Sequence, residues 1–294
     1  MALGECPLAR SVARMAKSVK KATELGFCPG VRRAIESTEK AAQSAPVFTL
    51  GKLVHNDAVV SELESMGIKV VYSLDDAHGL VAISAHGAPS QVYEELKRRG
   101  LKFIDTTCSI VRKAQQKASQ FANDGYFVVV YGDPNHTEVK GLLDRAGSNA
   151  AAGLSVSSVF KGRLPKRLAI LSQSTRLPQE VQAFLSELMT PLDKFEDIRI
   201  AVTLCPHVVR RAREAVSLAS STDFVVVVGD PQSSNSNRLV ERCNQVGRAK
   251  LVWSAHMIDS DWPELKAAKT VGVTSGTSSP NWLIDEVVAA IERL

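Results

Sequence analysis

The sequence of 294 residues lacks any apolar run approaching the ~20 residues that cross a membrane. It also lacks an apolar N-terminal stretch of the kind that a secretory signal needs. Aromatic residues make up only 5% of the chain, and the net charge of +5 is spread along it instead of forming a basic stripe. These absences argue against a protein that binds nucleic acid or a membrane. We expect a cytoplasmic protein whose mild positive charge suits anionic small molecules or an acidic protein partner.

Cysteine is scarce and widely spaced, so no pair of cysteines forms the CxxC motif that is typical of most iron–sulfur sites. The number of cysteines is odd and no secretion signal accompanies them, which argues against a disulfide framework and for a reducing compartment. The thiols are therefore either inert or metal-bound. They are Cys6, Cys28, Cys108, Cys205 and Cys243.

The N-terminal segment is basic, because residues 1–21 are rich in lysine and arginine and contain one acid, Glu5. Such a segment can resemble an organellar targeting peptide, but this one runs directly into a motif that starts at Gly26. We therefore expect a short basic tail or helix within an N-terminal extension, residues 1–25.

Three of the cysteines stand in a repeated motif. The motif reads CPGVRRA from Cys28, CSIVRKA from Cys108 and CPHVVRR from Cys205. In each copy a valine lies three residues after the cysteine and a basic residue lies five residues after it. A helical pattern of apolar residues comes after each cysteine, and extended-looking runs precede the second and third. We expect each of these cysteines to lie at a turn between a strand and a helix.

A second repeat keeps the same spacing. FVVVYGDPNHTEVKGL at 127–142 matches FVVVVGDPQSSNSNRL at 224–239, with the offset of 97 residues that also separates Cys108 from Cys205. Shifted back by 81 residues, His136 falls on His55. A third element, an apolar strand followed by a polar loop, recurs as LVAISAHGAPS, LAILSQSTRLP and VGVTSGTSSP.

These repeats predict an α/β fold with three related domains, 26–107, 108–204 and 205–294, each a small, mostly parallel sheet with covering helices. Ligand groups of parallel sheets gather at the carboxyl ends of the strands. Three units in pseudo-threefold arrangement would place their cysteines, with His55, His86 and His136, around one central cavity.

The equivalence of the three cysteines suggests one shared metal site. A lone cysteine is more often a buried structural thiol, but three units keep one at the same turn while their surroundings diverge. Three thiolates suit zinc or a cubane cluster, and a four-iron cluster held by three cysteines leaves one iron free for substrate. Cys6 and Cys243 lie outside the repeat, and we interpret them as incidental.

Polar groups at the other strand ends suggest an anion site and a proton source. The loops that begin at Ser233 and Thr274 combine short hydroxyls with helix starts, which favours phosphate, although helix capping explains such residues equally well. Histidines at matching positions favour a phosphate or diphosphate pocket. Glu138, two residues after His136, is a candidate general acid, or a first-turn glutamate that the helix dipole favours.

At this point the chain resembles the 4-hydroxy-3-methylbut-2-enyl diphosphate reductase family, from about Gly26 to the C-terminus. The resemblance rests on motifs in one order: GFCPGVRRAI, LVHNDAVV, SAHGAPS, DTTCSIV, HTEV, QSTR, TLC, SSNSNRL and TSGTSSP. It implies reductive dehydroxylation of that diphosphate to isopentenyl and dimethylallyl diphosphate, the last step of the methylerythritol phosphate route to isoprenoids. It also implies a monomer or homodimer that receives electrons from a donor such as ferredoxin or flavodoxin.

The resemblance further implies roles for individual residues. Cys28, Cys108 and Cys205 match ligands of a [4Fe–4S] cluster, and Glu138 matches the residue that delivers a proton. Ser174 and Thr175 match a polar pair near the hydroxymethyl end of the substrate. The diphosphate contacts are matched by His55, His86, His136, Ser233, Ser234, Asn235 and Ser278.

The chain departs from the family pattern after the third cysteine, where Pro206–Arg211 replaces a run rich in threonine and asparagine, and at Asn135, where glycine is usual. Two alternatives stay open. Quinolinate synthase also resembles three α/β units that share a cluster, but its motifs differ. A non-catalytic iron–sulfur or zinc protein, such as a redox sensor, would need the cysteines but not the histidines, Glu138 or the serine loops.

Overall fold

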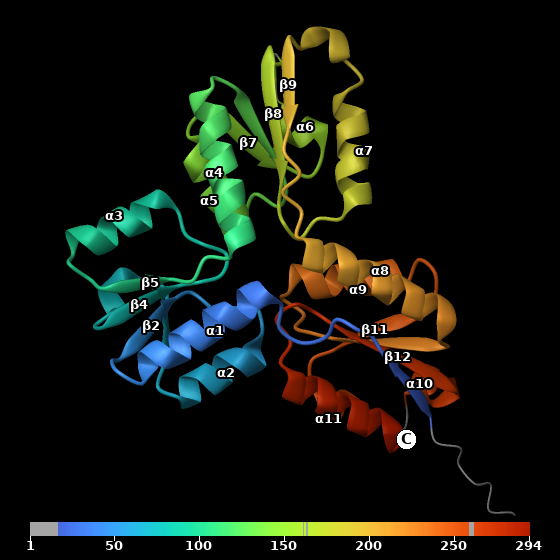
Figure 1. Cartoon of the computed structure of the whole chain (residues 1–294). Coiled ribbons are helices and arrows are strands. Elements are labelled where there is room, and N and C mark those ends of the chain that lie inside the picture. Colours follow the sequence, from blue (N-terminus) through green and yellow to red (C-terminus); the bar gives the residue numbers. More distant parts are fainter. Residues whose placement is uncertain (1–16, 161, 163, 259–261) are drawn as a thin grey trace, which may run out of the picture.

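The computed structural model describes residues 17–160, 162, 164–258 and 262–294. They form three lobes, each around its own four-stranded sheet, arranged about a common centre (Figure 1). Every strand pairing within these sheets is parallel. The expectation of three small parallel sheets with covering helices is therefore confirmed.

The first two lobes follow the chain in order. The first contains α1 (Pro29–Ala42), β2 (Val47–Leu50), α2 (Asp57–Ser65), β3 (Lys69–Val71), the 3-10 helix η1 (Leu74–Asp76), β4 (Leu80–Ile83), α3 (Ser90–Arg98) and β5 (Phe103–Asp105). The second contains α4 (Ser109–Asn123), β6 (Phe127–Tyr131), α5 (Thr137–Ala146), β7 (Ala150–Gly153), α6 (Val156–Val159), β8 (Arg167–Ser172), α7 (Pro178–Leu188), the 3-10 helix η2 (Leu192–Lys194) and β9 (Asp197–Ile200). Their strand orders, β3-β2-β4-β5 and β7-β6-β8-β9, are equivalent.

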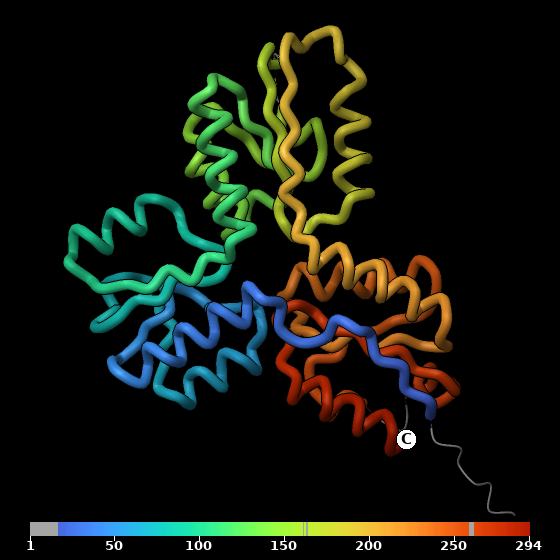
Figure 2. The backbone as a smooth tube through the Cα atoms, viewed as in Figure 1, coloured from blue at the N-terminus to red at the C-terminus, as the bar shows by residue number. Residues whose placement is uncertain are grey.

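The third lobe takes one strand from the N-terminus. Its other elements are α8 (Pro206–Ser221), β10 (Phe224–Val228), α9 (Ser234–Cys243), β11 (Ala249–Val252), the 3-10 helix η3 (Ala255–Met257), α10 (Pro263–Ala267), β12 (Thr270–Ser275) and α11 (Asn281–Glu292). Strand β1 (Ser18–Lys21) pairs with β12 and so fills the place that β5 and β9 fill in the other sheets. In Figure 2 the blue N-terminal segment accordingly runs along the red C-terminal lobe.

The interpretation of the N-terminal segment as a tail or helix is wrong for residues 18–21, because this stretch is the edge strand β1. Its backbone continues the pairing at both ends, since Ser18 N–H donates to Lys269 and Ala22 N–H donates to Val273. Like β5 and β9, β1 leads into a cysteine turn. The preceding part of the basic segment lies outside the described residues.

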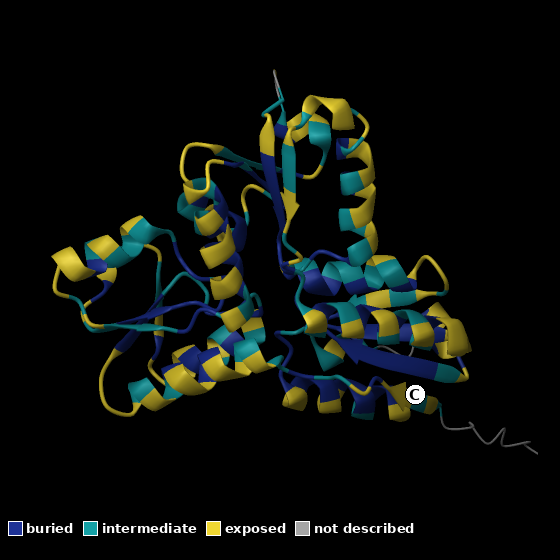
Figure 3. Ribbon diagram, turned by 45° about the horizontal axis from the view of Figure 1, so that its top comes forward, coloured by how far each residue is buried: buried dark blue, intermediate teal, exposed yellow. Residues whose placement is uncertain are grey.

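Each sheet is buried between helices on both faces. In the second lobe, α4 and α5 pack on one face of β6 and β8, and α6 and α7 pack on the other. The first and third lobes repeat this division into two apolar clusters. Figure 3 shows the result as buried strands inside helices whose outer faces are exposed. Because every lobe has its own core, the central region is built from loops.

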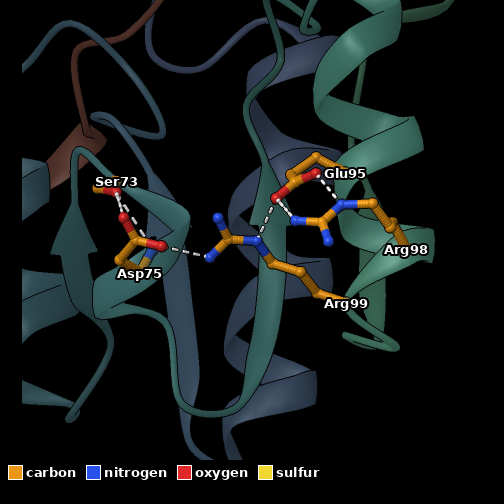
Figure 4. A network of polar contacts seen from close by, with 5 residues as sticks. All are labelled: Ser73, Asp75, Glu95, Arg98 and Arg99. Carbon is orange, nitrogen blue, oxygen red and sulfur yellow. Dashed lines mark hydrogen bonds and ion pairs between the residues drawn. The ribbon is translucent and has the colours of Figure 1, made fainter.

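Surface ion pairs add little to this arrangement. Arg99 at the end of α3 contacts Glu95 in the preceding turn and Asp75 in η1, and Arg98 shares Glu95 at 2.6 Å (Figure 4). Asp75 also accepts a hydrogen bond from Ser73 at 3.2 Å. Exposed pairs of this kind contribute roughly 0–1 kcal/mol each. The network ties η1 to α3 but lies away from the lobe junction.

No helix among the described residues is long and apolar enough to cross a membrane.

Candidate active site at the junction of the lobes

The three repeated cysteines occupy equivalent turns where the lobes meet. Each precedes the first residue of a helix, α1, α4 or α8, and these helices begin near the centre of Figure 1. The backbone N–H of each cysteine donates to a carbonyl in the loop after β4, β8 or β12 of a neighbouring lobe. These bonds run from Cys28 to Thr277 at 3.1 Å, from Cys108 to Ala85 at 2.9 Å and from Cys205 to Ser174 at 2.8 Å. The lobes are thus joined head to tail in a ring.

Gly30 in the first turn of α1 brings two of the thiols together. A Cβ atom added there would lie 2.6 Å from Cys108 Sγ and 3.9 Å from Cys28 Sγ. A separation of 2.6 Å is shorter than any ordinary contact, so a side chain at this position would displace the Cys108 thiol. Glycine in CPGV therefore makes the room into which the Cys108 thiol points.

All three thiols are half-buried, and burial disfavours the thiolate form of two of them. Burial raises the pKa of the Cys28 thiol, and it raises the pKa of Cys205 to about 11. Each thiol nevertheless stands at the positive end of a helix, which favours thiolate once a cation compensates the lost solvation. Three half-buried sulfur atoms at one junction are a donor set that suits a thiophilic metal or cluster.

Three histidines form a second cluster beside the junction. His55 follows β2, His86 follows β4 and His136 precedes α5, as the repeats predict. Their ring centroids lie 4.7 to 5.7 Å apart, and one nitrogen from each ring falls within 4.8 Å of the others. Burial and the neighbouring histidines lower the pKa of His86 to about 3, and burial with His55 lowers that of His136 to about 4. The rings are therefore neutral at pH 7.

The neutral state of His136 has a defined tautomer. Its Nδ1 accepts a hydrogen bond of 3.2 Å from the backbone N–H of Glu138, so the ring proton is on Nε2. This ring caps the N-terminus of α5 and leaves an N–H donor for a ligand. A cluster of such donors suits the oxygen atoms of a phosphate group.

The serine-rich loops of the third lobe lie against the first lobe. Ser278 donates to the backbone carbonyl of His55 at 3.2 Å, and Ser233 caps α9. Ser234 accepts a hydrogen bond of 3.0 Å from Arg238. The side-chain amide of Asn235 is buried, and neither its oxygen nor its nitrogen has a partner among the described residues. A buried amide without partners is unusual in a folded protein and indicates a polar ligand.

Glu138 is buried in α5, with only 1% of its surface exposed. Its carboxylate accepts hydrogen bonds from the Ser174 backbone N–H at 2.6 Å and from the Ser174 hydroxyl at 2.8 Å. Burial raises the pKa of this carboxyl, whereas both bonds from Ser174 act in the opposite direction. Beside Ser174, the hydroxyl of Thr175 is buried with no partner among the described residues. The arrangement can hold a proton next to a polar ligand.

Two arginines near the histidines, Arg176 buried and Arg238 partly buried, were not among the residues expected from the sequence. The positive charges of Arg238 and Arg176 contribute to the lowered pKa of His136, after burial and His55. Both arginines pair with Glu180, at 3.4 and 3.2 Å respectively. They belong to the motifs SSNSNRL and QSTR, so the signal was present in the sequence. Their charge makes this side of the junction attractive to an anion.

The other described cysteine, Cys243, ends α9 away from the cysteine turns, where it is fully buried and its thiol donates to the Ala215 carbonyl in α8. His78 packs against Phe48 in the first lobe. His207 lies in the first turn of α8, two residues after Cys205, and contacts Arg210. Cys6 lies outside the described residues.

Comparison with known proteins gives this arrangement a family. The model of the LytB protein family matches residues 19–292. The chain belongs to the LytB family, and it is an enzyme. A 4-hydroxy-3-methylbut-2-enyl diphosphate reductase of Dehalococcoides mccartyi is 41% identical over 94% of this chain and 98% of its own length. One of Geobacter sulfurreducens is 36% identical over 92% of this chain and 96% of its own.

Solved structures of LytB enzymes share the fold. The reductase of Plasmodium falciparum superposes with a TM-score of 0.86 and 28% identity, over 93% of this chain and 87% of its own. A structure described as (E)-4-hydroxy-3-methyl-but-2-enyl diphosphate reductase, the terminal enzyme of the non-mevalonate pathway, covers 95% of this chain and 100% of its own, with a TM-score of 0.71 and 26% identity. Membership of the LytB family favours the reductase over a quinolinate synthase.

Proposed function

We propose that this LytB enzyme reduces 4-hydroxy-3-methylbut-2-enyl diphosphate to isopentenyl and dimethylallyl diphosphate. The observation that carries the proposal is the head-to-tail junction, which brings three cysteine turns, three neutral histidines and one buried carboxyl together. We propose further that the enzyme acts in the cytoplasm, as a monomer or homodimer, with electrons from a small carrier such as ferredoxin or flavodoxin.

The cysteine turns fit a [4Fe–4S] cluster. Cys28, Cys108 and Cys205 would hold it, because their thiols stand at one junction and at three helix starts. Such a cluster, when bound, supplies electrons and one iron without a cysteine ligand. The room beside Gly30 and the absence of a fourth cysteine at this junction among the described residues agree with that donor set.

The diphosphate would lie against His55, His86 and His136, with Ser233, Ser234, Asn235 and Ser278 as further hydrogen-bond partners. The unpartnered amide of Asn235 can donate to a phosphate oxygen, and the Nε2–H of His136 can do the same. Arg176 and Arg238 supply positive charge near the same rings. Binding of the diphosphate fixes the position of the rest of the substrate.

Glu138 would act as the proton source at the hydroxymethyl end. Its carboxyl, held by Ser174, has a raised pKa and so keeps a proton at a higher pH than an exposed glutamate. The C–O bond breaks as two electrons enter, the departing oxygen takes a proton and leaves as water, and a second proton adds to the allylic carbon. Ser174 and Thr175 orient the group that leaves, and the surrounding lobes exclude bulk water.

An anaerobic assay of the reconstituted protein tests the proposal. Oxidation of a reduced dye is followed while 4-hydroxy-3-methylbut-2-enyl diphosphate is added. The parent should turn over, and Glu138→Gln should keep its iron but lose activity by about 10²- to 10⁴-fold, the usual contribution of a general acid. Cys108→Ser should lose iron, whereas Cys243→Ser, which alters a cysteine outside the junction, should keep both iron and activity.

The same assay separates the alternatives. A parent protein that binds a cluster without turnover would contradict the reductase and favour a redox sensor. A parent protein that binds no cluster under these conditions would overturn the metal site and return the cysteines to structural thiols.

A further inference from the structure

Arg211 in α8 is buried at the third lobe's side of the junction, with only 3% of its surface exposed. One terminal nitrogen donates to the Ser275 carbonyl at 3.2 Å, the Ser275 hydroxyl at 3.1 Å and the Gly276 carbonyl at 3.0 Å. The other donates to the Gly26 carbonyl at 2.7 Å. These partners lie just before Cys28 and just before Thr277.

The four bonds therefore enclose the Cys28 turn from both sides. Gly26 lies two residues before Cys28, and Thr277, next to Gly276, accepts the backbone hydrogen bond of Cys28 at 3.1 Å. Arg211 itself lies six residues after Cys205 on the helix that this second cysteine begins. One guanidinium thus connects the surroundings of two of the three cysteines.

The charge of Arg211 lacks the usual partner. Its four acceptors are neutral, and no carboxylate of a described residue lies within 4.0 Å of it. Arg176, which is similarly buried, pairs with Glu180 at 3.2 Å. A buried guanidinium without an anion is costly, so an anion is expected nearby.

The thiols of Cys28 and Cys205 are candidates for that anion. Burial lowers the pKa of the Arg211 guanidinium, while Cys28, Glu24, Glu214 and Cys205 act in the opposite direction. The two glutamates are engaged elsewhere, because Glu24 pairs with Arg210 at 2.6 Å and Glu214 accepts a hydrogen bond from the backbone of Glu24. The sulfur atoms remain as the groups whose negative charge Arg211 would balance.

We propose that Arg211 is a positioning residue of the cysteine site, which holds the Cys28 turn through its guanidinium fork and balances the negative charge of the thiolates and the cluster that they bind. This inference rests on the proposed function. A fixed positive charge stabilises the more negative, reduced state of a redox centre, so Arg211 raises the midpoint potential of the cluster. Its fork, with several donors in one plane, is what a lysine could not reproduce.

The experiment compares holoenzymes reconstituted without oxygen. The variants are Arg211→Gln, Arg211→Lys and, as a matched control two positions away on the same helix, Arg213→Gln, whose side chain is exposed. Three quantities are measured for each: the midpoint potential in a dye-mediated titration, the rate of iron release to a chelator, and the thermal unfolding midpoint.

Arg211→Gln should shift the midpoint potential to a more negative value and release iron about 10- to 100-fold faster. Arg211→Lys, which keeps the charge but loses the fork, should keep the potential and still release iron faster. Arg213→Gln should match the parent in both, since an exposed charge is screened by solvent. A residue that only stabilised the fold would lower the unfolding midpoint and leave the potential unchanged.

Parental potential and iron release in Arg211→Gln would overturn the proposal. Should that variant fail to fold, Arg211→Lys decides: parental iron release contradicts the role in positioning, and a shifted potential contradicts the role of charge. A parent protein without a cluster would overturn the proposed function and this inference together, and is recognised before any variant is compared.

Discussion

At the scale of single residues, Gly30 shows how one missing side chain decides what the junction can hold. The position needs no special backbone angle, but an added Cβ would lie 2.6 Å from the Cys108 sulfur atom. Gly30 is in the first turn of α1, two residues after Cys28, so an added side chain would displace either the Cys108 thiol or the Cys28 turn. The room that Gly30 leaves for the Cys108 thiol therefore matters to this site as much as the cysteine side chains do.

Gly30→Ala should therefore weaken iron binding by about 10- to 100-fold, the effect usual for disturbed metal ligands. Iron content after gel filtration and the rate of iron release to a chelator measure this effect. The matched control is Gly162→Ala, where an added Cβ meets nothing within 4 Å. Equal iron content in the two variants would contradict the packing argument.

The histidine cluster makes stability depend on pH in a known direction. The pKa of His86 falls from 6.5 to about 3 and that of His136 to about 4 on folding, so between these values and 6.5 the unfolded chain binds more protons. The stabilising contribution is thus present above pH 6.5 and is lost as the pH falls towards 3. Denaturant unfolding of the substrate-free protein at pH 7 and pH 4.5 should show this loss, and His86→Gln should reduce it.

An anion at the same rings should reverse part of that shift. Negative charge beside His86 and His136 favours their protonated forms and raises both pKa values. Binding of inorganic diphosphate near pH 6 should therefore take up protons, which calorimetry in buffers of different ionisation enthalpy detects. Binding without proton uptake would indicate that the rings act only as neutral donors.

At the scale of secondary-structure elements, β1 is the strand that links the two ends of the chain. It pairs with β12 and leads, as β5 and β9 do in the other lobes, to a cysteine turn. Its loss would expose the edge of β12 and free the segment before Cys28. The strand therefore supports both the third sheet and the Cys28 turn.

Deletion of residues 1–21 should lower the thermal unfolding midpoint and reduce the iron content of the reconstituted protein. Deletion of residues 1–16, which leaves β1 intact, serves as the control and should change neither quantity. Scanning calorimetry and iron analysis on the two truncated proteins are sufficient. Equal behaviour of both deletions would contradict a role for β1 in holding the Cys28 turn.

The sequence predicted the central strands and missed most edge strands. Strands β6 and β10 are runs of valine, and their apolar character is visible without a structure. Strands β3, β7 and β11 are short, partly exposed and contain lysine or alanine, so they give no alternating pattern. Strand β1 reads SVKK, and only its partner near the C-terminus makes it a strand.

The residues of the candidate site also divide into those that the sequence predicted and those that it did not. Cysteines and histidines could be found from the sequence because the repeats put them at equivalent strand ends. Arg211 could not, because its role depends on contact with Gly26, which is 185 residues away in the chain. Arg176 and Arg238 belong to the motifs QSTR and SSNSNRL, but the motifs alone do not show that their charges lie near the histidines, which depends on how the lobes pack.

At the scale of the whole molecule, three separate cores meet through loops. Each sheet has apolar clusters on both faces, and among the described residues these clusters stay largely within one lobe, although Leu177 of the second lobe joins a cluster of the third. A cluster with one ligand from each lobe would therefore stabilise the arrangement of the lobes more than their interiors.

Removal of the cluster should be visible as a regional change in hydrogen exchange. Without iron, the turns at Cys28, Cys108 and Cys205 should exchange faster, while β6 and β10 should keep their protection. Mass spectrometry of holo and apo protein under the same anaerobic conditions measures both regions. Uniform loss of protection across the lobes would show that the cluster instead supports the whole fold.

The position of β1 also determines when the third sheet can be completed during synthesis of the protein. Strand β1 leaves the ribosome first, and β12, its partner, is among the last strands to appear. At usual elongation rates the first strand waits on the order of ten to fifty seconds for its neighbour. Thr277, which fixes the backbone of Cys28, emerges just as late. The first two lobes can fold while translation continues, but the ring of cysteine turns closes only when the chain is nearly finished, so the proposed cluster would be inserted after synthesis.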